Sequence, residues 1–392
     1  MKRLLVAGAA LGLAAAVTLS VLGWYVSGRI YREALLAAYD HEPDRYDDAL
    51  VVAADSATLT LTATGDERGR VAREGMWEAR WKGGSGRVGR VIRKGPAPGG
   101  VGWTREFVPF GERPAPGDRV DLRLEVYPGD PMTSLGIPFE EVAIPTELGP
   151  ARGWFVPAAR ATWVVFVHGK GAPLRQALRS LGVFHSLGFP VLAIRYRNDD
   201  GAPSSPDGRY HYGLTEWRDL EAAVRFALDR GAADVVLVGE SMGGGIVASF
   251  LERSPLAPRA RAAILDAPML DFGETIDWGL AQATIPGTRL PMPALAGIVG
   301  KSFAARRYGV DWGALDLRRR AATIRAPLLL LHGDADAVVP YTTSLALARR
   351  FSDRVTLVSF HGANHAEAWN VDSLGFNRAV RGFLRKQIID RR

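Results

Sequence analysis

Five runs of consecutive apolar residues in the second half of the chain constrain its fold more than any other feature. They are "WVVFVHG" (163–169), "PVLAIRY" (190–196), "DVVLVGE" (234–240), "AAILDAP" (262–268) and "PLLLLHGD" (327–334). Short, continuous apolar runs are typical of strands that are buried on both faces of a sheet. Segments with helical spacing separate these runs. We therefore predict a mostly parallel α/β sheet with right-handed crossovers and helices on both faces.

The sequence before about residue 136 follows a different pattern, in which apolar and polar residues alternate. Residues 56–64 read "SATLTLTAT" and residues 119–127 read "RVDLRLEVY". This period of two indicates half-buried antiparallel strands, and Gly/Pro turns separate the shorter pieces between them. We predict a small β-rich domain, a sandwich or a barrel, over 29–135, followed by a catalytic α/β domain over 136–392.

The first 28 residues (1–28) point to a membrane. Lys2 and Arg3 precede an uncharged apolar stretch from Leu4 to Val26. That length crosses the hydrocarbon core of a bilayer, whereas the apolar region of a cleaved signal peptide usually has about 7–15 residues. We predict a signal anchor with the body of the protein outside the cytoplasm. A signal peptide cut near Ala16, which would leave a secreted protein, and a buried helix are the alternatives.

The composition excludes several classes of function. The net charge of +7 comes almost entirely from scattered arginines, so we expect no nucleic-acid partner. The chain has no cysteine. Disulfides, thiolate nucleophiles and cysteine–metal sites are therefore excluded.

The stretch "VVLVGESMGGG" (235–245) supplies a candidate nucleophile. Ser241 lies between a strand pattern and a small-residue helix pattern, with Gly239 two residues before it and Gly243 two residues after it. A turn this tight needs residues without bulky side chains at both positions, and it raises the hydroxyl above the sheet edge. We therefore predict that Ser241 is a nucleophile on a strand–turn–helix elbow, and not a serine in an ordinary glycine-rich loop.

A serine hydroxyl is a poor nucleophile unless a base takes its proton. His365 lies in the loop after the last apolar strand pattern and is the candidate base. His361, four residues earlier, competes for this role. His168 and His332 each open a His-Gly turn at the end of a strand, and we expect them to be loop scaffolds.

The acid that orients the histidine should follow a strand between the nucleophile and the base. Residues 332–340 read "HGDADAVVP" and offer two aspartates. The pattern H-G-x-x-D-x-x-V-P places the acid at Asp336, and Asp334 is expected to brace the loop. Asp266, at the end of the neighbouring strand, is the alternative acid.

The order serine, aspartate, histidine along the chain is the order found in α/β-hydrolases. Four motifs carry a resemblance to that superfamily: "HGKG", "GESMGG", "HGDADAVVP" and "GANH". From about residue 137 onward, the chain is similar to the branch that holds serine aminopeptidase-type hydrolases, prolyl-oligopeptidase-like domains and monoacylglycerol-lipase-like esterases. The resemblance does not extend to the first 135 residues.

The resemblance implies a serine hydrolase that works through an acyl-enzyme, with no metal and no organic cofactor. It also implies an oxyanion hole made by the backbone N–H groups of Met242 and Lys170. Lys170 departs from the lipase H-G-G-G form, because a bulky residue stands where a third small residue would be.

Residues 269–312 form an insertion rich in Trp, Met, Leu, Ile and Pro, as a cap over an apolar pocket would be. A packed helical excursion that adds only core is the alternative. An apolar cap favours lipid-like carboxylic esters as substrates. A peptidase or aminopeptidase is the second possibility, since Asp271, Glu274 and Asp277 could hold a substrate amine, although a solvated helix face is the simpler interpretation. A non-catalytic, membrane-tethered binding protein is the third.

Overall fold

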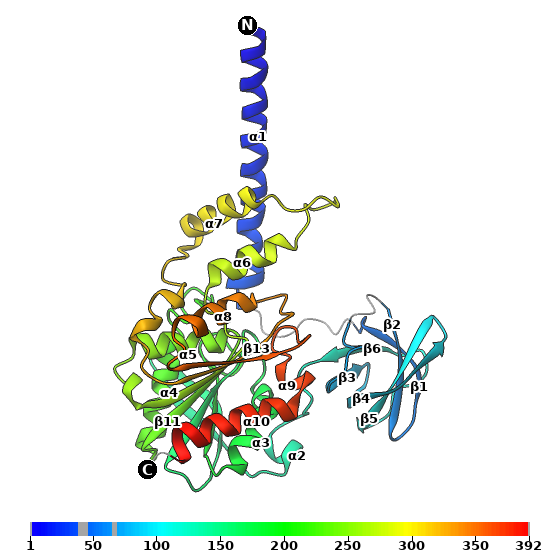
Figure 1. Ribbon diagram of the computed structural model, residues 1–392, viewed down its shortest axis with the longest axis vertical. Coiled ribbons are helices and arrows are strands. Elements are labelled where there is room, and N and C mark those ends of the chain that lie inside the picture. The colour runs from blue at the N-terminus through cyan, green and yellow to red at the C-terminus, as the bar shows by residue number, and fades with distance from the viewer. Residues whose placement is uncertain (1, 38–45, 65–68, 391–392) are drawn as a thin grey trace.

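A computed structural model describes residues 2–37, 46–64 and 69–390. They form a long N-terminal helix, a six-stranded closed barrel and an eight-stranded α/β sheet (Figure 1). The mostly parallel sheet with helices, preceded by a β-rich domain, confirms the fold class expected from the two periodicities.

The large sheet has the strand order β14-β13-β12-β11-β9-β10-β8-β7. Its strands are β7 (Glu140–Thr146), β8 (Gly149–Val156), β9 (Thr162–Val167), β10 (Val191–Ile194), β11 (Asp234–Glu240), β12 (Ala260–Asp266), β13 (Leu328–Gly333) and β14 (Val355–Phe360). Strand β8 runs antiparallel to β7 and β10, and the other neighbouring pairs are parallel. The carboxyl ends of the parallel strands therefore meet at one edge, where sites form in such sheets.

Helices cover both faces of this sheet, which explains why its strands are apolar throughout. In β9, Val165 and Val167 pack into the core cluster on the side of α4 and α5, while Val164 and Phe166 pack into the cluster beside α3 and α10. The helices are α2 (Pro131–Leu135), α3 (Leu178–Ser186), α4 (Trp217–Asp229), α5 (Met242–Arg253), α8 (Tyr341–Arg350), α9 (Ala368–Val371) and α10 (Ser373–Leu384).

The barrel closes in the order β1-β2-β5-β4-β3-β6 around its own apolar core. Its strands are β1 (Ala49–Ala54), β2 (Thr58–Ala63), β3 (Trp77–Trp81), β4 (Gly84–Ala97), β5 (Gly100–Phe110) and β6 (Arg119–Arg123). Arg105 is fully buried in it and donates hydrogen bonds to five backbone carbonyls, those of Arg70, Val71, Arg73, Gly75 and Gly89. Burial lowers the pKa of Arg105 to about 10. This guanidinium fixes the segment that joins β2 to β3.

The same segment ties the barrel to the α/β sheet. Arg70 Nε lies 2.9 Å from Glu367 Oε1, and Arg73 Nη2 lies 2.8 Å from Glu367 Oε2. The Glu367 carboxylate is buried and also accepts a hydrogen bond from the backbone N–H of Asn364. A second link comes from Asn370. Its side-chain amide donates hydrogen bonds to the backbone carbonyls of Met76, just before β3, and Leu124, just after β6. The barrel has a separate core, but it is joined by buried polar contacts to the loop between β14 and α9.

The N-terminal helix α1 (Lys2–Arg29) continues into a π-helical segment, Ile30–Leu35. Within the described residues it is the one helix long and apolar enough to cross a membrane, with a mean hydropathy of 1.8 over its most apolar window. Its far end packs on the α/β sheet. Tyr212 donates its hydroxyl to the carbonyl of Ala34, and Leu35 joins the large core cluster. The expected boundary at residue 29 needs this correction: residues 30–36 belong to the catalytic half and not to the barrel.

The insertion between β12 and β13 forms a cap beside α1. It contains α6 (Phe272–Ala281), α7 (Ala294–Tyr308) and two short 3-10 turns, Leu317–Arg319 and Ala321–Thr323. The excursion therefore continues past the expected end at residue 312. Helix α7 packs against the lower part of α1 and against α6, and both cap helices lie above the α/β sheet in Figure 1.

We predict that the double variant Arg70→Gln, Arg73→Gln lowers the free energy of unfolding by about 3 kcal/mol. This is the lower end of the range for breaking a buried ion pair, because both arginines keep partial contact with solvent while Glu367 does not. Chemical denaturation in detergent measures the change. Arg90→Gln is the matched control, because its pair with Glu106 on the same barrel is exposed. Equal losses in the two proteins would contradict the prediction.

Candidate active site

Ser241 lies on a strained turn between β11 and α5. Its backbone has φ 53° and ψ −117°, a conformation that residues other than glycine rarely adopt. A Cβ on Gly239 would lie 2.5 Å from the carbonyl oxygen of Gly243, and a Cβ on Gly243 would lie 2.2 Å from that of Val167. Both glycines are therefore required by the close approach of β11, α5 and β9. This packing raises the Ser241 side chain at the carboxyl edge of the sheet.

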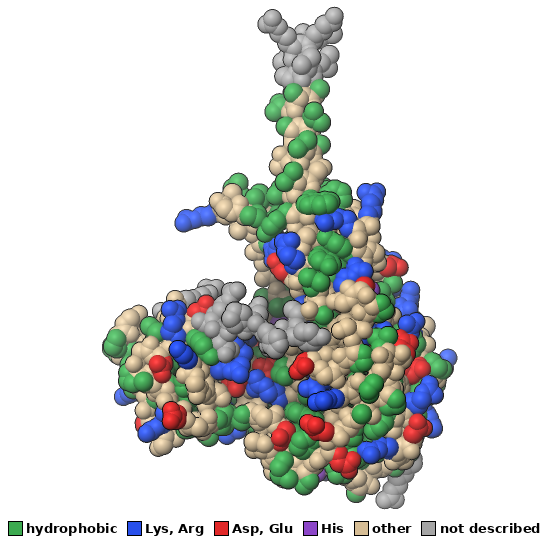
Figure 2. All heavy atoms as spheres, turned by 180° about the vertical axis from the view of Figure 1, so that it is seen from behind, with side chains coloured by type: hydrophobic (Ala, Val, Ile, Leu, Met, Phe, Trp, Pro, Cys, Tyr) green, Lys and Arg blue, Asp and Glu red, His purple; other side chains and the backbone are tan. Residues whose placement is uncertain are grey.

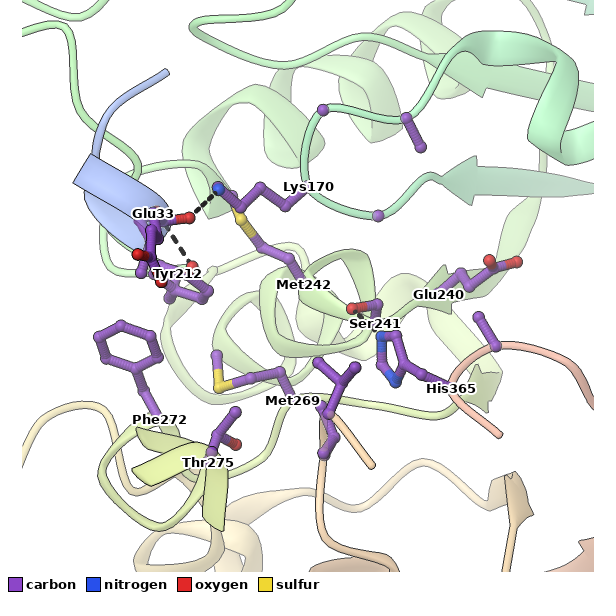
Figure 3. Close-up of a pocket in the computed structure, with 18 of the residues that line it drawn as sticks. Glu33, Lys170, Tyr212, Glu240, Ser241, Met242, Met269, Phe272, Thr275 and His365 are labelled. Atoms are coloured by element: carbon purple, nitrogen blue, oxygen red, sulfur yellow. Dashed lines mark hydrogen bonds between the residues drawn. The ribbon is translucent and has the colours of Figure 1, made fainter. Parts of the chain in front are cut away.

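His365 and Asp336 meet Ser241 from two other loops, and Figure 3 shows the His365 ring beside the Ser241 hydroxyl. His365 Nε2 lies 2.8 Å from Ser241 Oγ, and His365 Nδ1 lies 2.8 Å from Asp336 Oδ2. The loop after β14 supplies His365, and the loop after β13 supplies Asp336. The structure thus brings together the three side chains selected from the sequence.

Asp336 is held by more partners than the sequence indicated. The backbone N–H groups of Val338 and Val339 donate to Oδ1, and His332 Nε2 lies 3.1 Å from Oδ2. Burial alone would raise the pKa of Asp336, but hydrogen bonds from His332 and His365 outweigh it and hold the pKa below its usual value. The carboxylate is therefore ionised and fixed in place, ready to accept the His365 N–H.

The alternative base and its neighbouring acid lie elsewhere. The His361 side chain is almost fully exposed, and its Nδ1 lies 2.9 Å from Asp334 Oδ2. Asp334 also accepts the backbone N–H of Gly362, so it braces the turn before His365. This pair forms a contact at the outside of the loop and leaves the Ser241 hydroxyl to His365.

Asp266, the alternative acid, belongs to a buried charge cluster behind the elbow. Arg179 reaches both carboxylate oxygens of Glu240, each at 2.5 Å, and also donates to Asn370. Burial raises the pKa of Asp266 to about 7, and the nearby Arg179 offsets only part of that effect. Asp266 therefore keeps its proton to a higher pH than an ordinary aspartate, and its backbone carbonyl accepts the N–H of Ser241.

The two backbone donors expected for an oxyanion lie on either side of Ser241. Met242 is the first residue of α5, and Lys170 follows Gly169, where an added Cβ would lie 3.4 Å from Ser241 Cβ. The Lys170 side chain points away from this turn, and its Nζ lies 2.5 Å from the Glu33 carbonyl in the π-helical segment that follows α1 (Figure 3). Its bulk therefore does not occupy the space beside the hydroxyl.

A cavity of about 800 Å³ extends from Ser241 and His365 to the end of α1. Its lining is largely apolar and comes from α1, the elbow and the cap: Val26, Ile30, Met242, Met269, Phe272 and Ile276. The charged residues in the lining are Arg29, Glu33, Glu125, Lys170 and Glu240. The volume is in the range of pockets that bind small organic molecules, roughly 300–1,000 Å³.

The comparison with protein families agrees with this geometry. The family described as "Alpha/beta hydrolase family" matches residues 164–379. The chain belongs to the alpha/beta hydrolase family. The match includes all three loops that meet at Ser241, whereas the barrel and α1 lie outside it.

Distant relatives of this alpha/beta hydrolase include esterases. The bifunctional esterase/perhydrolase of Acinetobacter calcoaceticus is 27% identical over 233 residues, which cover 49% of this chain and 83% of the relative. A non-heme chloroperoxidase of Streptomyces lividans is 25% identical over 255 residues, covering 54% of this chain and 90% of the relative. A Pyrococcus furiosus esterase has a similar fold, with a TM-score of 0.53 and 19% identity, and covers 67% of this chain and 97% of its own.

The cap carboxylates are not free in the hydrolase. Asp271 is buried, caps α6 and pairs with Arg318, which also lies 2.8 Å from Glu274; Asp277 lies 2.5 Å from Lys301. The solvated helix face expected from the sequence is therefore wrong for Asp271. Each of the three acids already has a cationic partner.

One group of carboxylates in the described part of the chain is close enough to share a metal ion. It consists of Asp47, Asp48 and Asp121, which lie on the barrel and outside the cavity. Burial raises the pKa of Asp48. The group has no contact with Ser241 and contributes nothing to the site.

Two contributors to the site were missed by sequence reasoning. His332, expected to be a scaffold, binds the same oxygen of Asp336 as His365 does; its spacing of four residues from Asp336 was a usable signal. Glu367 holds the N–H of Asn364 beside His365, and nothing in the sequence connected it with Arg70 and Arg73.

The raised pKa of Asp266 makes stability depend on pH. Because the folded state keeps the proton up to about pH 7 while the unfolded carboxyl loses it near pH 4, stability falls as pH rises through this window. Asp266→Asn keeps a neutral side chain, so we predict a smaller loss of stability between pH 5 and pH 8 than in the wild type.

Urea unfolding at the two pH values measures this loss. Asp334→Asn is the control, because hydrogen bonds from His361 and Gly362 outweigh burial and lower the pKa of that exposed carboxyl. Parallel losses in the wild type and Asp266→Asn would show that Asp266 is ionised in the folded protein.

Proposed function

We propose that this hydrolase cleaves carboxylic esters with lipid-like groups through an acyl-enzyme formed on Ser241. The observation that carries the proposal is the unbroken chain of hydrogen bonds from Ser241 Oγ through His365 to Asp336, at the end of a largely apolar cavity. Such a chain activates a hydroxyl that is otherwise a weak nucleophile.

In the first half of the reaction, Ser241 Oγ attacks the ester carbonyl carbon while His365 Nε2 takes the hydroxyl proton. The carbonyl oxygen becomes an oxyanion, which accepts hydrogen bonds from the N–H groups of Met242 and Lys170. Each such donor contributes about 2.7–4 kcal/mol to the lowering of the barrier. Asp336 stabilises the imidazolium that forms. His365 then gives its proton to the departing alcohol, and the acyl group stays on Ser241.

In the second half, water enters and the same groups act again. His365 takes a proton from the water as its oxygen attacks the acyl carbon, and the oxyanion returns to the two backbone donors. The bond to Ser241 Oγ breaks, and His365 returns the proton to that oxygen. The products are one alcohol and one carboxylic acid, with one water consumed.

The cap acids that the sequence offered as binders of a substrate amine give no support to peptides with a free amino terminus as substrates. An aminopeptidase needs an unpaired carboxylate for the substrate ammonium, whereas the cap acids are paired with Arg318 and Lys301. The relatives named esterases support the same choice. A non-catalytic binding protein has no need of the strained backbone at Ser241, so we give this alternative the least weight.

Ser241→Ala tests the proposed mechanism. We expect a fluorophosphonate probe to label the wild type and not the variant, and kcat for a p-nitrophenyl ester to fall by about 10⁴-fold or more. Ser56→Ala, at an exposed serine of the barrel, is the matched control and should keep full labelling. Equal labelling of wild type and Ser241→Ala would remove Ser241 from the mechanism.

We also propose that α1 anchors the hydrolase in a membrane, with the barrel and the α/β sheet outside the cytoplasm. The support is the length and hydropathy of α1 and the exposure of its first part, where Leu11, Leu13, Val17 and Val21 are more than half exposed. Exposing apolar side chains to water is unfavourable in free energy, whereas exposing them to the hydrocarbon of a bilayer is not.

The anchor is tested by extraction with carbonate. We expect the wild type to stay in the membrane pellet, and Leu13→Arg with Val17→Arg to release it, because each arginine near the bilayer centre costs about 2.5–3.5 kcal/mol. A shortened wild-type protein in the soluble fraction would show instead that the segment is a cleaved signal peptide.

A further inference from the structure

The lower end of α1 is both the end of the predicted membrane span and a wall of the cavity. Within the predicted stretch Leu4–Val26, residues 4–22 alone rise roughly 28 Å at 1.5 Å per residue, which is about the thickness of the hydrocarbon core. The next turns hold Val26 and Ile30, which are buried and line the cavity that contains Ser241. The site therefore begins within two helical turns of the expected bilayer surface.

Helix α7 crosses α1 at this level. A Cβ on Gly23 would lie 2.4 Å from Val299, and a Cβ on Gly300 would lie 2.4 Å from Val26, so the two helix backbones are in close contact. Trp24 packs edge-on against Phe303. Aromatic side chains of this kind mark the boundary between hydrocarbon and headgroups. If α1 spans a bilayer as proposed above, this contact would put α7 at the level of the headgroups.

The cap presents an apolar surface at the same level. Leu295 and Ile298 on α7 and Leu290 on the preceding hairpin are 57%, 58% and 62% exposed. The hairpin (284–291) projects beside α1 in Figure 1, and Figure 2 shows hydrophobic side chains continuing from α1 onto the cap at its base. Exposed apolar side chains beside a membrane span can lie against the lipid surface.

We propose that the cap is seated in the bilayer surface, in the leaflet where α1 ends, and that a single-chain ester lipid enters the cavity sideways from this leaflet. The occupant of the apolar cap surface is thus the lipid bilayer itself. The entering chain would pass along α1, where Val26 and Ile30 give it an apolar wall as far as Ser241. The substrate part of this inference rests on the proposed ester hydrolysis, and the seat of the cap rests on the proposed membrane anchor α1.

The seat can be measured directly, because the chain has no cysteine and single cysteines label uniquely. Leu295→Cys and Ile298→Cys, each carrying an environment-sensitive NBD probe, are compared in phosphatidylcholine/phosphatidylglycerol nanodiscs with Ile92→Cys. Ile92 is similarly exposed at 56%, but it lies on the barrel strand β4. We expect the two cap probes to be quenched by nitroxide lipids and protected from iodide, and the Ile92 probe to show the reverse.

Two outcomes would overturn the seat. Cap probes quenched by iodide as strongly as the Ile92 probe would place the cap in water. Cap probes protected from both iodide and nitroxide lipids would show that protein covers this surface, as in contact with a second copy of the chain.

The entry route is tested with two esters and one double variant. Leu295→Glu with Ile298→Glu should lower kcat/KM for a monoacylglycerol in nanodiscs by about tenfold or more, because carboxylates leave the interface. It should not change kcat/KM for a soluble short-chain p-nitrophenyl ester. Ile92→Glu is the control and should change neither value.

The outcomes separate this inference from the proposed function. An equal loss on both esters would show that the variant damages the fold, and unchanged hydrolysis of both would overturn entry from the bilayer. If the wild type hydrolyses neither ester although the cap probes lie in lipid, the proposed function fails together with the entry route, and the seat of the cap stands.

Discussion

The close packing of β9, β11 and α5 around Ser241 is the constraint on which the rest of the site depends. The backbone of Ser241 is held at φ 53°, and the carbonyls of Val167 and Gly243 come so near the elbow that no side chain fits at Gly243 or Gly239. Such strain persists only when the surrounding core over-determines it. The two-faced apolar core of the sheet supplies this support, and so fixes where the proposed nucleophile can meet a base.

The barrel and the N-terminal helical segment both reach the site from outside the family match through polar contacts, of which those of the barrel involve the buried Glu367 carboxylate and that of the N-terminal segment is exposed. Arg70 and Arg73 of the barrel neutralise Glu367, which holds the loop of His365. At the other side, the end of α1 receives the Lys170 side chain through the Glu33 carbonyl. Since these contacts lie beside the two loops that flank Ser241, the added parts act as supports of the site and not as appendages.

The residues of the candidate site could be selected from the sequence because each is marked locally. Ser241 is framed by two glycines, Asp336 by the H-G-x-x-D spacing and His365 by its place after the last strand. Residues whose roles depend on distant partners could not be found in this way. In the sequence, nothing distinguishes Glu367 from other acidic residues in loops. Its partners Arg70 and Arg73 lie almost 300 residues away along the chain. The boundary near residue 29 failed for the same reason, because Leu35 and Ala34 are bound by the α/β sheet and not by their neighbours in sequence.

The sequence by itself determined the class of each region: a sheet buried on both faces, a half-buried β domain, an apolar span and a glycine-framed serine. These follow from periodicity and from steric limits on the chain, which act over a few residues. Only the tertiary structure decided that two histidines share Asp336, that the barrel neutralises Glu367, and that α1 forms a wall of the cavity. These arrangements arise because a buried charge is unfavourable unless it is paired, and because burial of apolar surface is favourable. Neither effect depends on how far apart the residues lie along the chain.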